Sequence, residues 1–157
     1  MNEMRKKYLI GLAITLTVVC IILMFLNNPR IVIYMNWKIY LPKPQERNVI
    51  YRFQYREGED LEIWQYAEKD IKKITNKEIF KNIGEQNKEF IQQKLKEYYE
   101  VLNDTNKQLL NDNVNILSLL EESNYFAYIN KENDTKTWLL LIINTKTNEL
   151  YYFSNVY

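Results

Sequence analysis

The sequence predicts an α+β fold: an N-terminal transmembrane helix, then one small domain in which an antiparallel β-sheet of about six strands packs against a long amphipathic helix. Three observations predict it. Residues 8–26 carry no charge, several later segments alternate between apolar and polar residues, and a helical apolar stripe lies between those segments. The expected order of elements in the domain is β-β-β-α-β-β-β.

The uncharged run at residues 8–26 predicts a membrane anchor, because a helix of this length covers roughly the 30 Å hydrocarbon core of a bilayer. A cleavable signal peptide would have a shorter apolar core and end in small residues. This run ends instead in bulky residues and is followed by Asn27. A lipoprotein would carry its lipid on Cys20, but the apolar run continues beyond that residue. The sequence favours an uncleaved signal anchor, with cleavage or lipidation as the alternatives.

The basic residues at positions 5–7 lie directly before the apolar run and indicate the orientation of the chain. Positive charge beside a first membrane helix favours the cytoplasmic side. The expected organisation is therefore a basic cytoplasmic tail at 1–7, a transmembrane signal anchor at 8–26 and an extracytoplasmic α+β domain at 27–157. This places a single-pass protein in the cell membrane with its C-terminal domain outside.

The first part of the domain reads as three strands. Residues 31–41 alternate as an extended segment that Pro42 ends, since proline cannot donate to a sheet ladder. Residues 48–56 alternate most clearly, and residues 61–66 return after an acidic turn, which predicts a hairpin.

The middle of the chain changes to helical spacing. Residues 75–78 fit a capping box for a short helix that Gly84 would end. A longer helix is predicted over residues 86–103 from an apolar stripe on one face, formed by Ile91, Leu95, Tyr98 and Leu102. Residues 104–115 are rich in Asn and Asp and indicate mainly loop, whereas residues 116–122 are ambiguous.

The last third predicts a three-stranded meander with strands at 125–131, 137–144 and 149–154. Residues 138–143 are apolar at every position. Such a run is typical of a central strand that is covered on both faces.

Composition excludes several kinds of chemistry. The chain contains no histidine, so the commonest general base and the commonest zinc ligand are absent. Its 21 basic and 20 acidic residues nearly balance, which leaves no electrostatic footprint for nucleic acid. The acidic residues around 57–62 lack the spacing of a calcium loop and indicate a solvated turn. We therefore expect no metal, no cofactor and no nucleic-acid partner.

Tyrosine is the clearest excess, with 13 residues beside three tryptophans and six phenylalanines. Such rings suit sugar faces and partner surfaces, because they combine apolar area with a polar group. The candidate binding residues are Trp64 and Tyr66 on one strand, and Tyr98 and Tyr99 on the long helix. The alternative is that these rings fill the core of a small sheet domain.

The chain resembles small uncharacterised membrane-anchored proteins of Gram-positive bacteria. The resemblance rests on the anchor, the segment at 37–44, the Tyr-rich strand and the ending at 149–153. The similarity covers about half of the chain, and its motifs are short. It implies the location and the fold class, and no activity.

The sequence thus favours a non-enzymatic, membrane-anchored binding or accessory domain outside the cytoplasm, with a protein or an envelope glycan as partner. The alternative is a small membrane immunity or exclusion protein directed against a toxin or phage. A hydrolase that uses carboxylates alone is a third hypothesis, and it predicts a deep cleft lined by two acids with raised pKa values.

Overall fold

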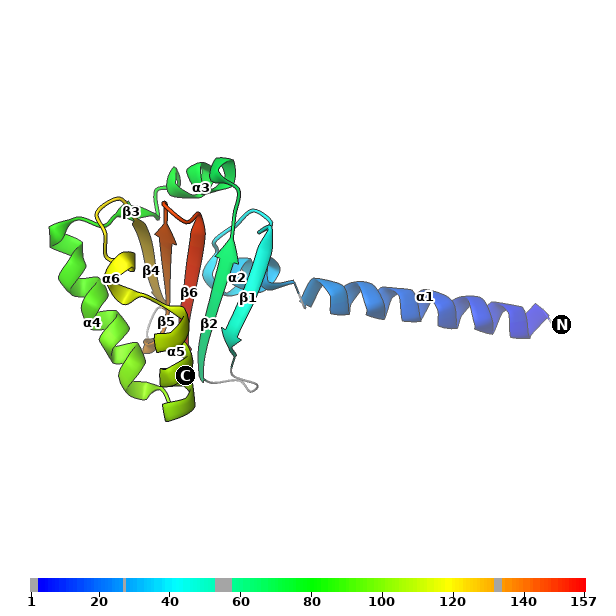
Figure 1. Cartoon of the computed structure of the whole chain (residues 1–157). Coiled ribbons are helices and arrows are strands. Elements are labelled where there is room, and N and C mark those ends of the chain that lie inside the picture. Colours follow the sequence, from blue (N-terminus) through cyan, green and yellow to red (C-terminus); the bar gives the residue numbers. More distant parts are fainter. Residues whose placement is uncertain (1–2, 27, 53–57, 132–133) are drawn as a thin grey trace. The chain divides into compact units, whose positions relative to one another are not determined.

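The computed structural model describes residues 3–26, 28–52, 58–131 and 134–157. The chain divides into two compact units, Met1–Leu41 and Pro42–Tyr157 (Figure 1). The acidic turn predicted between the strands at 48–56 and 61–66, and the end of the first of these strands, fall partly outside the described residues.

The first unit begins with helix α1, Glu3–Leu26, so the predicted N-terminal helix forms. Side chains from residue 10 to residue 23 are exposed. The hydroxyls of Thr15 and Thr17 donate to the carbonyls of Gly11 and Ala13, at 3.0 and 2.8 Å. Within the residues that the structure describes, none of the helices combines the length and the apolar character needed to cross a membrane. The helix is confirmed, and its crossing of a membrane stays a prediction.

The strand predicted at residues 31–41 is wrong, because helix α2 occupies Pro29–Trp37. The side chain of Asn28 accepts a hydrogen bond from the Arg30 backbone N–H at 3.1 Å and caps the helix. Pro29 stands at its first position, where a missing N–H costs nothing. The helix ends at Lys38, whose φ of 58° is left-handed. These capping signals outweigh the short alternation of side chains at residues 31–41. That alternation spans too few residues to distinguish the period of a strand from that of a helix.

The second unit is built on a six-stranded antiparallel sheet, so the predicted α+β class and strand number are confirmed. Along the sheet the order is β1-β2-β6-β5-β4-β3. The strands are β1 (Glu46–Tyr51), β2 (Gly58–Gln65), β3 (Lys81–Asn82), β4 (Tyr125–Lys131), β5 (Asp134–Asn144) and β6 (Glu149–Val156). The sixth strand is the short β3, which pairs with β4, and not a strand at 31–41.

The predicted meander is confirmed, with β5 between β4 and β6. Every residue from Trp138 to Ile143 is buried, as expected of a strand covered on both faces. The hairpin turn from β5 to β6 contains Asn148 with a φ of 57°, a left-handed conformation that asparagine tolerates better than most residues.

Helices α4 (Glu85–Val101), α5 (Asp104–Asn113) and α6 (Ile116–Leu119) cover one face of the sheet (Figure 1). The long helix predicted at 86–103 is confirmed as α4, and its predicted stripe is buried. This stripe packs in one cluster with α5, α6 and the central strands, through Leu110, Leu119, Leu61, Leu140 and Phe153 among others.

Two predictions about the helices are wrong. Residues 75–78 do not begin a helix: α3 (Glu68–Thr75) ends there, and Gly84 caps the start of α4. Residues 104–113 form α5 because Asn103 accepts a hydrogen bond from the Asn106 N–H at 2.9 Å and Leu110 is buried. A segment rich in Asn and Asp indicates a loop, whereas here an asparagine serves as the helix cap.

Candidate functional site

Three of the four aromatic residues predicted to bind a partner lie in the interior. Trp64 and Tyr98 have no exposed surface, and Tyr66 is 1% exposed. Trp64 and Tyr66 contact each other, with ring centroids 6.5 Å apart, whereas Tyr98 packs in the cluster on the helix-covered face. A surface patch built on these three rings is therefore not present in this conformation.

The hydroxyl groups of the two buried tyrosines have hydrogen-bond partners in the protein. The hydroxyl of Tyr98 donates to the Asp60 carbonyl at 2.7 Å, and that of Tyr66 donates to the Pro42 carbonyl at 3.2 Å. The indole of Trp64 stacks on Tyr152 with an interplanar angle of 5° and a centroid distance of 6.4 Å. These contacts fit rings that fill the core and tie loops and strands to it.

A buried carboxylate, Glu62, lies beside Trp64 on the face of the sheet opposite the helices. Its oxygens accept two hydrogen bonds from Arg47 at 2.5 and 2.6 Å, one from Arg52 at 2.6 Å and one from the Trp64 indole at 2.7 Å. Burial alone would raise the pKa of Glu62, but these hydrogen bonds and the two guanidinium charges lower it overall. The group stays ionised and fully bonded, which suits a structural ion pair.

Other carboxyl groups with displaced pKa values are also displaced downward. Hydrogen bonds from a lysine or a threonine hydroxyl lower the pKa of Glu68, Glu97 and Asp134. A carboxylate hydrolase needs an acid whose pKa is raised. The displaced carboxyl groups in the described part of the chain have the opposite tendency.

The acidic residues near the first hairpin have separate partners. Glu59 accepts a hydrogen bond from the Tyr157 hydroxyl at 3.1 Å, and Asp60 accepts one from the Ser154 hydroxyl at 3.4 Å. Glu62 is held by its two arginines. In the described residues, no group of three or more acidic, histidine or cysteine side chains is placed to hold a metal ion.

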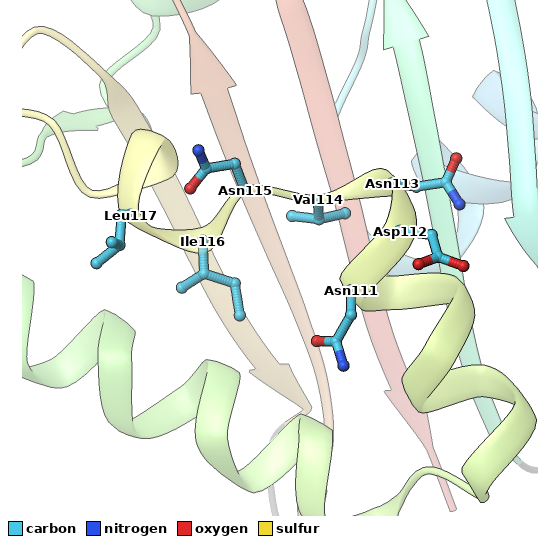
Figure 2. Close-up of a pocket in the computed structure, with 7 residues that line it drawn as sticks. All are labelled: Asn111, Asp112, Asn113, Val114, Asn115, Ile116 and Leu117. Atoms are coloured by element: carbon cyan, nitrogen blue, oxygen red, sulfur yellow. The ribbon is translucent and has the colours of Figure 1, made fainter.

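An open hollow near the helix-covered face follows residues 111–117, where α5 ends and α6 begins. It is open to solvent, has a volume of about 590 Å³ and is lined by Asn111, Asp112, Asn113, Val114, Asn115, Ile116 and Leu117. Figure 2 shows the side chains of Asn111, Ile116 and Leu117 directed to the same side of this segment, and Asn115 directed to the other. Leu117 is 80% exposed.

The amides of this hollow are held by the protein itself. The Asn111 side chain donates to the Tyr99 hydroxyl at 3.5 Å, and the Asn113 side chain donates to the Leu109 carbonyl at 2.8 Å. Asn115 accepts a hydrogen bond from the Ser118 N–H at 3.3 Å. An amide has several donor and acceptor positions, so one internal bond fixes its orientation and leaves capacity for another partner.

Tyr99 is the one predicted aromatic residue that reaches the surface, and it is partly buried against the core. Its hydroxyl lies at the edge of the hollow through the contact with Asn111, and the Lys107 ammonium lies 5.5 Å from its ring centroid. The structure therefore connects Tyr99, on helix α4, to the 111–117 segment. Trp64 lies instead in strand β2, and Tyr66 directly follows that strand.

Asn111, Leu117 and Phe90 are surface residues that were not among the predicted site residues. Phe90 is 40% exposed on α4 and meets Tyr128 edge-to-face at a centroid distance of 5.1 Å. Its position directly before Ile91 puts it outside the buried stripe, and that offset was the available signal. Asn111 lies in a segment rich in Asn and Asp, a composition that does not distinguish an exposed helix end from a loop.

No protein-family model, no curated protein and no solved structure matches this chain.

Proposed function

We propose that this protein is a single-pass membrane protein whose C-terminal domain lies outside the cytoplasm and binds a protein or an envelope glycan without catalysing a reaction. One observation carries the proposal: residues 8–26 are uncharged and lie within the helix α1, whose described side chains from residue 10 to 23 are exposed.

The exposed side chains of α1 support the proposed anchoring role. A helix that is apolar on all sides needs an apolar environment around its whole circumference. The polar side chains within the run are small, and Thr15 and Thr17 bond their hydroxyls to carbonyls of the same helix. Such internal bonds lower the cost of placing a hydroxyl in hydrocarbon.

The binding role is supported by the surface of the second unit. An open hollow at residues 111–117 presents oriented amides beside an exposed leucine, and Tyr99 adjoins it. A few fixed polar groups combined with apolar area are typical of a recognition site. The lowered pKa of Glu62 supports a non-catalytic role for that buried acid, since its charge is fully used by two arginines.

Topology is tested by cysteine labelling of the full chain in intact cells. Cys20→Ser removes the native thiol, and Lys96→Cys adds one at a position that is 69% exposed. We expect a membrane-impermeant maleimide to label this variant before lysis. Ser154→Cys is the matched control: Ser154 is fully buried, so its thiol should react only after the protein is unfolded. Labelling of Lys96→Cys only after lysis would place the domain in the cytoplasm and overturn the proposed location.

Anchoring is tested by placing one charge in the middle of α1. Leu16→Arg should move the protein from the membrane fraction to the soluble fraction, because a central arginine costs about 2.5–3.5 kcal/mol on insertion scales. Leu16→Val is the matched control and should stay in the membrane fraction. Equal distribution of both variants after alkaline extraction would contradict the anchor.

A further inference from the structure

We propose that helix α2 lies in the headgroup region of the membrane, with its exposed apolar side chains directed into the lipid. The inference rests on the proposed anchoring of the chain by α1 and adds a second membrane contact to it. The partner of this surface is therefore a phospholipid layer.

Helix α2 carries apolar side chains on the side that the protein leaves exposed as well as on the side that it buries. Ile33 and Trp37, one helical turn apart, are buried. Val32, Tyr34 and Met35 are exposed, and the exposed fractions of Tyr34 and Met35 are 52% and 56%. A helix that is apolar on both sides is typical of one that meets a second apolar environment.

The connection to α1 indicates which environment this is. Helix α1 ends at Leu26 and α2 begins at Pro29. Consecutive Cα atoms are about 3.8 Å apart, so at most about 11 Å separates these two ends. The polar zone on one side of a bilayer is about 5–8 Å thick. If α1 spans the hydrocarbon core, α2 begins in this zone or beside it.

The backbone between the two helices also separates their directions. Asn28 is extended, with a φ of −82° and a ψ of 111°, and Pro29 follows it. A residue before proline avoids the helical region, so α2 does not continue the axis of α1. A second helix that starts at the membrane surface in a new direction brings its own exposed side to that surface.

Paired cations and tyrosines lie around α2, a combination typical of the interfacial zone of membrane proteins. The Arg30 guanidinium lies 5.6 Å from the ring centroid of Tyr40 and donates to its hydroxyl at 3.2 Å. The Lys38 ammonium lies 5.9 Å from the ring centroid of Tyr34. Such rings sit at the level of the headgroups, where basic side chains meet the lipid phosphates.

The charges of this segment favour phospholipid over a neutral or basic protein surface. Residues 27–41 contain two cations, Arg30 and Lys38, and no acidic residue. Arg30 donates to the Leu41 carbonyl at 3.0 Å as well as to Tyr40, and a guanidinium has five N–H donors. The remaining donors and the Lys38 ammonium are suited to phosphate oxygens.

The test is spin labelling of the full chain in bilayers made of equal parts of phosphatidylcholine and phosphatidylglycerol. Oxygen concentrates in lipid and a neutral nickel chelate in water, so the ratio of their collision rates with a nitroxide reports its depth. In a Cys20→Ser background, the label is attached to Met35→Cys on α2, Leu16→Cys in α1 or Lys96→Cys on α4. We expect a several-fold higher oxygen-to-nickel ratio at positions 16 and 35 than at position 96.

A second substitution tests whether the exposed apolar side holds α2 in the lipid. With the label at position 35, Tyr34→Glu should shift α2 toward water at least about tenfold, because half of a ring loses its burial and a charge is added. Tyr34→Phe is the matched control: it keeps the ring and should leave the ratio unchanged. Because Tyr34 is exposed, both variants should keep the thermal midpoint of the native chain.

Three results would overturn the inference: a water-like ratio at position 35, protection of that label from both reagents by a protein partner, or no effect of Tyr34→Glu. The label at position 16 separates these results from failure of the proposed function. A lipid-like ratio at position 16 in the same bilayers would show that the anchor is in place although α2 is not in the lipid. A water-like ratio at position 16 would refute the anchor itself, and with it both proposals.

Discussion

The buried carboxylate of Glu62 gives the sharpest prediction about what stabilises this fold. Glu62→Gln keeps the size of the side chain and removes its charge. Glu62 is 2% exposed and accepts four hydrogen bonds, three of them from guanidinium groups. Glutamine has one oxygen and one amino group, so its amino end would face donors from an arginine or from Trp64.

The magnitude follows from what remains after the substitution. Removing one partner of a buried ion pair costs about 3–5 kcal/mol in unfolding free energy. The Arg47 and Arg52 side chains are 24% and 50% exposed, so both can turn partly toward water. Because water can solvate both guanidinium groups again, we expect the loss of unfolding free energy at the lower end of this range, about 3 kcal/mol.

The assay is urea unfolding of the full chain in mild detergent, followed by tryptophan fluorescence, to which Trp64 beside the carboxylate contributes. Glu46→Gln is the matched control, because Glu46 is an exposed carboxylate on the neighbouring strand β1. It should change the unfolding free energy by less than about 0.5 kcal/mol. An equal effect of the two substitutions would refute the structural role of the Glu62 ion pair.

The pH dependence provides an independent check on the same group. The folded protein holds the pKa of Glu62 below its ordinary value, so the unfolded chain takes up a proton first as the pH falls. The stabilisation is complete above the unfolded pKa of about 4.3 and is lost as the pH drops through the lower folded value. The stability gap between the native chain and Glu62→Gln should therefore narrow in acid. A gap that stays constant from neutral to strongly acidic pH would contradict this reasoning.

Further predictions concern packing, capping and the hairpin turn. Leu140→Ala should cost about 2–5 kcal/mol in urea unfolding, because Leu140 is fully buried in the central strand. Asn103→Ala should cost about 1 kcal/mol and reduce helical circular dichroism, since the cap of α5 is lost. Asn148→Ala should lower the thermal midpoint more than Asn148→Gly, because glycine accepts the left-handed φ of 57° without strain.

The sequence predicted best where one pattern is long and uninterrupted. The apolar run from Trp138 to Ile143 identified a central strand, and the stripe from Ile91 to Leu102 identified α4. Prediction failed where a helix is short and its signals lie in its caps. At α2 and α5 the decisive residues are Asn28 and Asn103, and an asparagine has the same identity whether it caps a helix or forms a loop.

The site was harder to predict because surface position depends on the fold. Tyr98 and Tyr99 are neighbours in sequence, yet a helix turns successive side chains by about 100°, so one faces the core and the other its margin. Which of the two tyrosines is buried depends on which face of the helix carries the apolar stripe. The hollow at residues 111–117 required more, since it forms only if α5 and α6 exist, and both segments lacked a strong apolar period.

The excess of tyrosine has a physical explanation that composition alone could not supply. A ring buries a large area, and its hydroxyl can bond to a carbonyl at the edge of the core, as Tyr66 and Tyr98 do with Pro42 and Asp60. The same ring at a surface would give the same composition. The number of aromatic residues therefore does not show whether their rings are buried in the core or exposed at the surface. In this domain the rings of Trp64, Tyr66 and Tyr98 belong to the interior, whereas Tyr40, Phe90 and Tyr157 are exposed.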